Sequence, residues 1–249
     1  MTKEEIGIEF YTDIKALAAM PELHPKPMKA FTPTWWKDMP AHPDPDDRFS
    51  KSVKVCPSFP DFFSLGYVIP MWTDTILKYD WRSKTYNFEY GQQISGQDGT
   101  HHRVSIHLNS QLLDYTPTAN FLGKSSNFVF KFVCPWYAKT APGYSLMQLP
   151  MFYNFNGDFS VMPGVIDTDI HHIINQQVVY HGDGEEIFIK KGTPIAQYIP
   201  FKRSLYTATS QAFTPEFKEE NDIALFKIAS SFEGGYRESQ RNRDNKNNG

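Results

Sequence analysis

The sequence predicts a mainly β protein with a proline-rich N-terminal extension and a helix near the C-terminus. Segments such as Lys84–Gly91 and Ser126–Val133 alternate aromatic or β-branched side chains with polar ones, the two-residue period of a strand. Gly, Asn and Asp punctuate these segments, which is typical of a sandwich or barrel. Seven of the 18 prolines fall between Pro21 and Pro45.

The N-terminal region predicts one strand followed by a connector. Residues 4–11 alternate apolar and polar side chains, the pattern of a half-buried strand. Proline fixes φ and removes a backbone donor, so Pro21–Pro45 is expected to run as extended connector and turns. Trp35 and Trp36 are the residues that would anchor this segment, as core side chains or as a platform for a base or sugar.

The next segments predict a short helix and then almost uninterrupted strands. A helix is expected over Ser58–Leu65, ended by Gly66, and a buried strand over Tyr67–Trp72. Residues 128–203 are expected to form a contiguous, mainly antiparallel core with Gly143 in a turn.

The end of the chain predicts a helix and a tail. Asn221 is a suitable N-cap, and the apolar residues that follow it lie on one side of a helix over Asn221–Phe232, which predicts that this side is buried. A second turn glycine, Gly192, precedes the last predicted strand of the core. We therefore expect one domain over residues 1–232, made of N-terminal strands and connector (1–127), core (128–203) and helical segment (204–232), followed by a flexible tail (233–249).

Composition narrows the function classes. With 40% hydrophobic and 21% charged residues the chain is expected to fold, and a net charge of −3 gives no field that favours nucleic acid or a membrane. The N-terminal residues lack the features of a targeting peptide, which predicts a cytoplasmic protein. Cys56 and Cys134 lack the spacing of a metal or disulfide framework, and the common enzyme motifs do not occur.

Segments of the second half resemble motifs of the dUTPase and dCTP-deaminase superfamily in the same order. They are Lys139–Pro150, Met162–Ile170 and Glu186–Arg203. This resemblance implies a dUTPase-like β-clip, which is a distorted antiparallel barrel or sandwich, and a homotrimer with clefts between subunits. Together with Pro33–Pro40 and Val55–Pro70, the same segments resemble an uncharacterised family of phage and bacterial proteins, which implies the host-cell cytoplasm if the chain is phage-encoded.

The resemblance also implies a ligand site. In the superfamily the residue that matches Asp167 contacts the sugar and positions a water, with Mg²⁺ on the ligand's phosphates, so Asp167 is the candidate catalytic residue. The alternative is that Asp167 only caps a β-turn. Mg²⁺ is expected only if a phosphate ligand is bound, and no metal site is expected on the protein itself. The candidate ligand-binding residues are Gly164, Asp167, Asp169, His171, His172 and Gln197.

Several positions depart from the enzymes' pattern. Met151 and Phe152 follow Pro150 where the enzymes carry Arg and Ser, and neither side chain can grip a phosphate. Ile170 stands where the enzymes stack a Tyr on deoxyribose, and no Glu matching the deaminase proton-transfer group lies between residues 153 and 164. The chain is therefore expected to be neither a functional dUTPase nor a dCTP deaminase.

Three functions remain open from the sequence. The first is a protein that binds a nucleotide or related small molecule without hydrolysing dUTP, and the second is an enzyme with altered nucleotide or sugar chemistry in which Asp167, His171 and His172 act. The third is a virion or assembly protein that uses the fold as a structural unit. A further alternative, an iron or zinc site in a cupin-like barrel, would combine His102 with His172 or His181.

Overall fold

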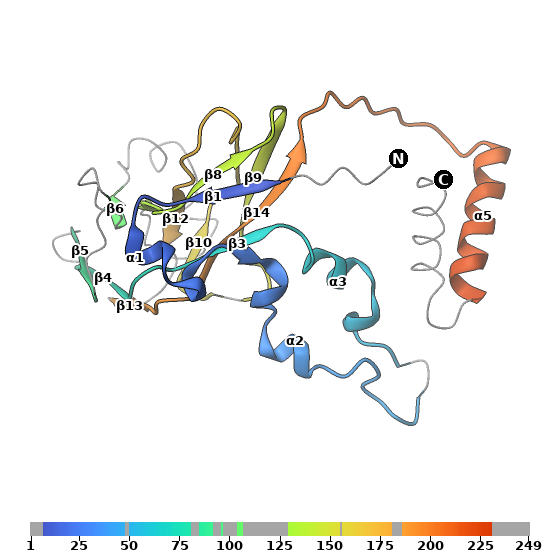
Figure 1. Cartoon of the computed structure of the whole chain (residues 1–249). Coiled ribbons are helices and arrows are strands. Elements are labelled where there is room, and N and C mark those ends of the chain that lie inside the picture. The colour runs from blue at the N-terminus through green and yellow to red at the C-terminus, as the bar shows by residue number, and fades with distance from the viewer. Residues whose placement is uncertain are drawn as a thin grey trace. The chain divides into compact units, whose positions relative to one another are not determined.

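In the computed structural model most of the described helices and strands are strands (Figure 1). Two compact units are present. The first, called the β unit below, comprises residues 7–38 and 63–203, and the described residues of the second unit lie within 39–62 and 204–230. The described residues of the whole chain are 7–47, 50–80, 85–91, 96, 104–106, 129–154, 156–180 and 186–230.

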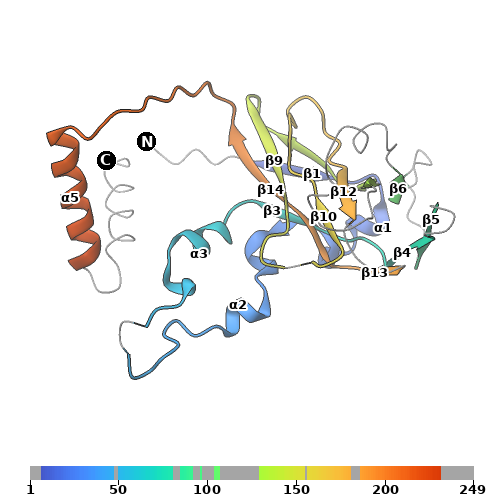
Figure 2. The ribbon, with the colours of Figure 1, turned by 180° about the vertical axis from the view of Figure 1, so that it is seen from behind.

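A five-stranded antiparallel sheet forms the middle of the β unit. Its strands, in spatial order, are β11 (Gly164–Ile166), β9 (Tyr144–Pro150), β14 (Pro194–Lys202), β3 (Tyr67–Pro70) and β2 (Lys26–Pro27). Figure 2 shows β14 between β9 and β3. Ile195, Ala196, Gln197 and Tyr198 of β14 are all buried, because both faces of the sheet are covered there.

Three smaller antiparallel sheets complete the described strands. The four-stranded sheet has the order β10 (Phe159–Val161), β12 (Gln176–Tyr180), β7 (Val129–Phe132) and β6 (Val104–Ile106). The three-stranded sheet has the order β13 (Glu186–Ile189), β4 (Thr75–Asp80) and β5 (Thr85–Tyr90), and the two-stranded sheet pairs β1 (Ile8–Tyr11) with β8 (Tyr137–Thr140). The protein is therefore mainly β, as the sequence predicts.

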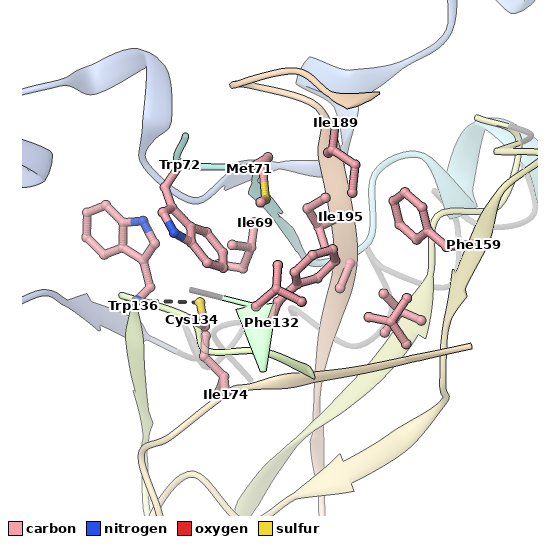
Figure 3. Close-up of a cluster of buried hydrophobic side chains, with 14 of the residues drawn as sticks. Ile69, Met71, Trp72, Phe132, Cys134, Trp136, Phe159, Ile174, Ile189 and Ile195 are labelled. Carbon is pink, nitrogen blue, oxygen red and sulfur yellow. Dashed lines mark hydrogen bonds between the residues drawn. The ribbon is translucent and has the colours of Figure 1, made fainter. Parts of the chain in front are cut away.

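The core lies between these sheets and is rich in aromatic rings (Figure 3). Trp72, Phe132 and Phe159 are fully or almost fully buried, and the ring of Phe132 meets both of the others edge to face, with centroids 6.3 and 5.9 Å apart. Such ring pairs stabilise a core beyond the area that they bury. Cys134 lies in the same cluster, and burial raises the pKa of its thiol to about 12, so this cysteine is an unreactive core residue.

Three glycines adopt the left-handed backbone that turns require. Gly143 has φ +83° and Gly192 has φ +86°, so both turn predictions are confirmed. Gly66, just before β3, has φ +67°. The buried strand predicted over Tyr67–Trp72 is observed as β3, which ends at Pro70. Residues 161–165 and 187–199 contain no helix, as the core prediction requires.

The proline-rich segment differs from the extended connector that the sequence predicts. Short helices interrupt it, because proline is well tolerated at the first position of a helix and Pro21 occupies such a position. The helices within it are η1 (Pro21–Leu23), η2 (Met28–Phe31) and α2 (Thr34–Asp38), and a further short helix, α1 (Lys15–Ala18), precedes it.

The second unit contains η3 (Val53–Val55), α3 (Ser58–Phe62) and α5 (Pro215–Ser230). The predicted helix at Ser58 is confirmed but is shorter than expected. The predicted N-cap at Asn221 is wrong, because α5 begins six residues earlier, where Thr214 Oγ1 accepts a hydrogen bond from Phe217 N at 3.2 Å. Ile223, Leu225 and Phe226 are exposed, where burial was expected.

Several predictions lie partly or wholly outside the described residues. They are the N-terminal half of the strand at 4–11, most of the strands between 92 and 128, and the tail 233–249. The expectation of a single domain over 1–232 stays a prediction. None of the described helices combines the length and apolar character needed to cross a membrane.

Candidate functional site

Asp167 and Asp169 lie in a turn that follows β11. The carbonyl of Asp167 accepts hydrogen bonds from Ile170 N at 3.0 Å and His171 N at 2.8 Å, which closes the turn. Because Ile166 pairs with Leu146 and Phe201 pairs with Ser145, this turn lies beside the start of β9 and the end of β14. The register thus brings both carboxylates to one edge of the five-stranded sheet.

Arg203 joins these carboxylates in a closed cluster. Its guanidinium donates to both oxygens of Asp169, at 2.9 Å to Oδ1 and 2.6 Å to Oδ2, and its Nη1 lies 3.2 Å from Asp167 Oδ1. Ser145 Oγ donates to Asp167 Oδ1 at 2.6 Å and accepts from Arg203 Nη1 at 3.0 Å. Gly143 N donates to Asp169 Oδ2 at 2.8 Å, so a backbone donor adds to the two-pronged arginine contact.

The cluster holds Asp169 in its charged form. Hydrogen bonds from Arg203 and then from Gly143 lower the pKa of Asp169 to about 2, and the contact with Asp169 raises the pKa of Arg203. The Asp169 side chain is only 8% exposed, whereas that of Asp167 is 52% exposed. Arg203 or Ser145 already bonds to Asp167 Oδ1 and to both oxygens of Asp169, so these three oxygens do not fit a Mg²⁺ ion.

The other candidate residues from the sequence are not gathered into one site. Gly164 begins β11, His171 is exposed, and His172 Nδ1 donates to the Thr168 carbonyl at 2.9 Å. Gln197 is fully buried and donates to the Leu65 carbonyl at 2.8 Å. It pairs with Leu149, four residues along β9 from Ser145, or about 14 Å at the rise of a strand.

Within the described part of the chain, no group of three His, Cys, Asp or Glu side chains lies close enough to hold a metal ion. His102 and His181, which the cupin-like alternative needs, lie outside the described residues.

A separate cleft of about 380 Å³ opens in the β unit. This volume falls in the range of small-molecule sites, roughly 300 to 1,000 Å³. Its walls come from the end of β9 and the loop after it, from β10, and from the start of β14; the lining residues are Pro150, Met151, Phe152, Tyr153, Asn154, Asn156, Phe159, Ser160, Val161, Thr193, Pro194 and Ile195. Figure 3 shows Phe159 and Ile195, which belong to both the core and this cleft.

Tyr153, in the wall of the cleft, has a strained backbone. Its φ of +67° is the one positive φ of a residue other than glycine in the described part of the chain. A bulky residue in this conformation costs about 1 to 3 kcal/mol and persists only where the surroundings enforce it. Such strained residues cluster at functional sites, which makes the cleft a candidate.

The proline-rich segment supplies what holds Tyr153. Trp35 Nε1 donates to the Tyr153 carbonyl at 2.9 Å, and the rings of Trp36 and Phe63 lie 6.1 and 5.2 Å from the Tyr153 ring. Trp36 and Phe63 are buried. The tryptophan pair therefore anchors the loop that forms one wall of the cleft.

Asn154 contributes an unpaired donor beside Tyr153. Its Nδ2 is buried and finds no hydrogen-bond partner among the described residues. A buried polar group without a partner is costly, so an acceptor supplied by a ligand or a water would stabilise Asn154.

Comparisons with known proteins assign no family to the chain. A scan against models of protein families finds no match, and a search of curated proteins finds no similar sequence.

No pattern in the sequence indicates the cleft. Met151 and Phe152 stand out in the sequence only as departures from an enzyme motif, and both line it. The strain at Tyr153 depends on Trp35, which is 118 residues away, so no local pattern reports it.

Proposed function

We propose that the protein binds a small molecule in the cleft beside Tyr153 and does not hydrolyse dUTP. The observation that carries this proposal is the coincidence, in one cleft of about 380 Å³, of a strained residue and an unpaired buried donor. The contacts within the cluster of Asp167, Asp169 and Arg203 favour a structural role over ligand binding, since its charged groups bind one another.

The proposal includes the finer features of the fold that the resemblance implies. These are a dUTPase-like β-clip over residues 128–203, membership of a phage-type family, and a proline-rich extension that belongs to the same domain. The antiparallel pairing of β9 with β11 and β14 supports the β-clip. The contact between Trp35 and Tyr153 supports the inclusion of the extension.

Ligand binding is tested by thermal unfolding with a panel of nucleobases, nucleosides, nucleotides and sugars. A ligand at 100 times its dissociation constant adds about 2.7 kcal/mol to the free energy of unfolding. Ser160 is exposed on β10 and lines the cleft, so Ser160→Trp fills the cleft at little cost to the fold. Lys139→Trp, at an exposed strand position outside the lining, is the matched control.

We expect at least one member of the panel to stabilise the wild type and Lys139→Trp but not Ser160→Trp. Equal stabilisation of both variants by every ligand that binds would place binding elsewhere and would contradict the proposal.

The absence of dUTP hydrolysis is tested separately. Met151 and Phe152 occupy the positions of a phosphate grip, and loss of a single donor in comparable sites slows reactions by about 100-fold or more. We expect no release of pyrophosphate from dUTP with Mg²⁺ above the uncatalysed rate. Rapid release would overturn this part of the proposal.

A further inference from the structure

We propose that the ligand of the cleft is an uncharged aromatic ring that carries a hydrogen-bond acceptor, and that Asn154 Nδ2 donates to that acceptor. This inference rests on the proposed function, because it names the chemical class that the same cleft selects. Three features of the described lining support it: the lack of charged side chains, the apolar side chains, and the buried Asn154 donor that has no partner among the described residues.

The described part of the wall carries no formal charge. None of its described lining residues is an Asp, Glu, Lys, Arg or His. A charged ligand that moves from water into a cleft without an opposite charge loses its solvation and gains no ion pair. Both anions and cations are therefore disfavoured. Phosphate groups are therefore a poor match for the lining.

The apolar surface of the wall suits a flat ring. The lining residues include three aromatic residues, Phe152, Tyr153 and Phe159, together with Met151. Aromatic rings pack favourably against other rings and against sulfur, with more contact area than a saturated sugar presents.

The unpaired donor sets the polarity of the ligand. Asn156, the other amide of the lining, uses its Oδ1 to accept from Asp158 N at 2.8 Å and Phe159 N at 3.2 Å, which fixes the loop. Asn154 Nδ2 has no acceptor among the described residues, and it is shielded from solvent, so the side chain turns toward the cleft when a ligand acceptor pairs with it. A ligand carbonyl or ring nitrogen would supply one, whereas a ligand that offers only donors would leave it unpaired.

The test uses four one-ring probes of similar size. Acetophenone offers a neutral acceptor, ethylbenzene offers none, benzoate is an anion, and benzamidine is a cation with donors only. Dissociation constants are measured by NMR titration of the full chain at millimolar probe concentrations, together with the ¹H–¹⁵N signals of the Asn154 side-chain amide.

We expect acetophenone to bind about tenfold more tightly than ethylbenzene, and more tightly than either ion, with a shift of the Asn154 amide signal. Asn154→Asp replaces the donor with a carboxylate, so the preference should reverse in favour of benzamidine. The comparison among the four probes uses only the wild-type protein, so it tests the inference even if Asn154→Asp folds poorly.

The outcomes separate this inference from the proposed function. In one outcome, Ser160→Trp abolishes probe binding, but acetophenone and ethylbenzene bind the wild type equally or benzamidine binds it best. The cleft is then a ligand site, and the role assigned to Asn154 is wrong. If Ser160→Trp leaves the binding of all four probes unchanged, the cleft is not a ligand site and both proposals fall.

Discussion

Gly66 illustrates how a single residue constrains this fold. Its φ is +67°, and a Cβ built there would overlap the backbone carbonyl oxygen of Tyr198 on β14. Its own carbonyl accepts a hydrogen bond from Met28 N at 3.1 Å. Gly66 therefore lets β3 enter the sheet against β14, and any side chain would have to push two strands apart.

Gly66→Ala should destabilise the protein by more than about 2 kcal/mol, because the left-handed backbone alone costs about 1 to 2 kcal/mol and the steric overlap adds to it. Gly143→Ala is the matched control, since Gly143 has φ +83° but a Cβ there would meet nothing within 4 Å. Free energies of unfolding from urea titration measure both. Equal losses for the two variants would show that the close approach to Tyr198 is absent.

Asp169 gives a prediction about acid. Its pKa is about 2 in the folded protein, below the ordinary value of 3.8, so its contribution to stability is complete above pH 4 and is lost as the pH falls toward 2. The difference in unfolding free energy between the wild type and Asp169→Asn should therefore shrink steadily from pH 4 to pH 2. A difference that is constant across this range would contradict the contact with Arg203.

At the scale of elements, α5 shows which local signals determine a helix start. The helix start has an N-cap in Thr214, a proline at the first position in Pro215 and an acidic first turn in Glu216. Hydrogen bonds from its own backbone and from Thr214 lower the pKa of the Glu216 carboxylate. Lys218 Nζ and Asp222 Oδ2 pair at 2.7 Å along the first turns.

Replacing each candidate cap with alanine separates the two helix starts. Thr214→Ala should cost α5 about 1 kcal/mol and reduce the helical signal in circular dichroism. Asn221→Ala should raise that signal slightly, because alanine has a higher helix propensity than asparagine. A larger loss from Asn221→Ala would mean that the helix begins where the sequence pattern first indicated.

The strands and turns of residues 129–203 could be predicted because their signals are local. Alternating burial along β12 and positive φ at Gly143 and Gly192 follow directly from residue type. The partners of the candidate site could not be predicted in this way. Asp169 meets Arg203 across 34 residues, and Trp35 meets Tyr153 across 118, so both contacts depend on strand register rather than on neighbouring residues.

At the scale of the whole molecule, exposed apolar residues favour the homotrimer that the sequence resemblance implies. Val165 lies on β11, the edge strand of the five-stranded sheet, and pairs with Met147 of β9. Val165 is 59% exposed, Ile170 in the following turn is 77% exposed, and Met147 is also exposed. Exposed apolar residues at and beside a sheet edge are typical of a surface that another chain covers.

Light scattering at micromolar concentration should therefore give a mass of three times 28.7 kDa. Val165→Glu and Ile170→Glu should reduce that mass, because each would bury a charge in the interface. Phe188→Glu changes an equally exposed apolar residue, 58% exposed on β13, and should leave the trimer intact. A wild-type mass near 28.7 kDa would rule the trimer out.

The most direct test of the central claim is a crystal structure of the wild-type protein soaked with the tightest-binding member of the ligand panel. We predict density for the ligand between Tyr153, Phe159 and Ile195, with an acceptor atom within hydrogen-bond distance of Asn154 Nδ2. Ligand density beside Asp167 and Arg203, with an empty cleft at Tyr153, would contradict the account and would return the site to the position that the sequence resemblance implies.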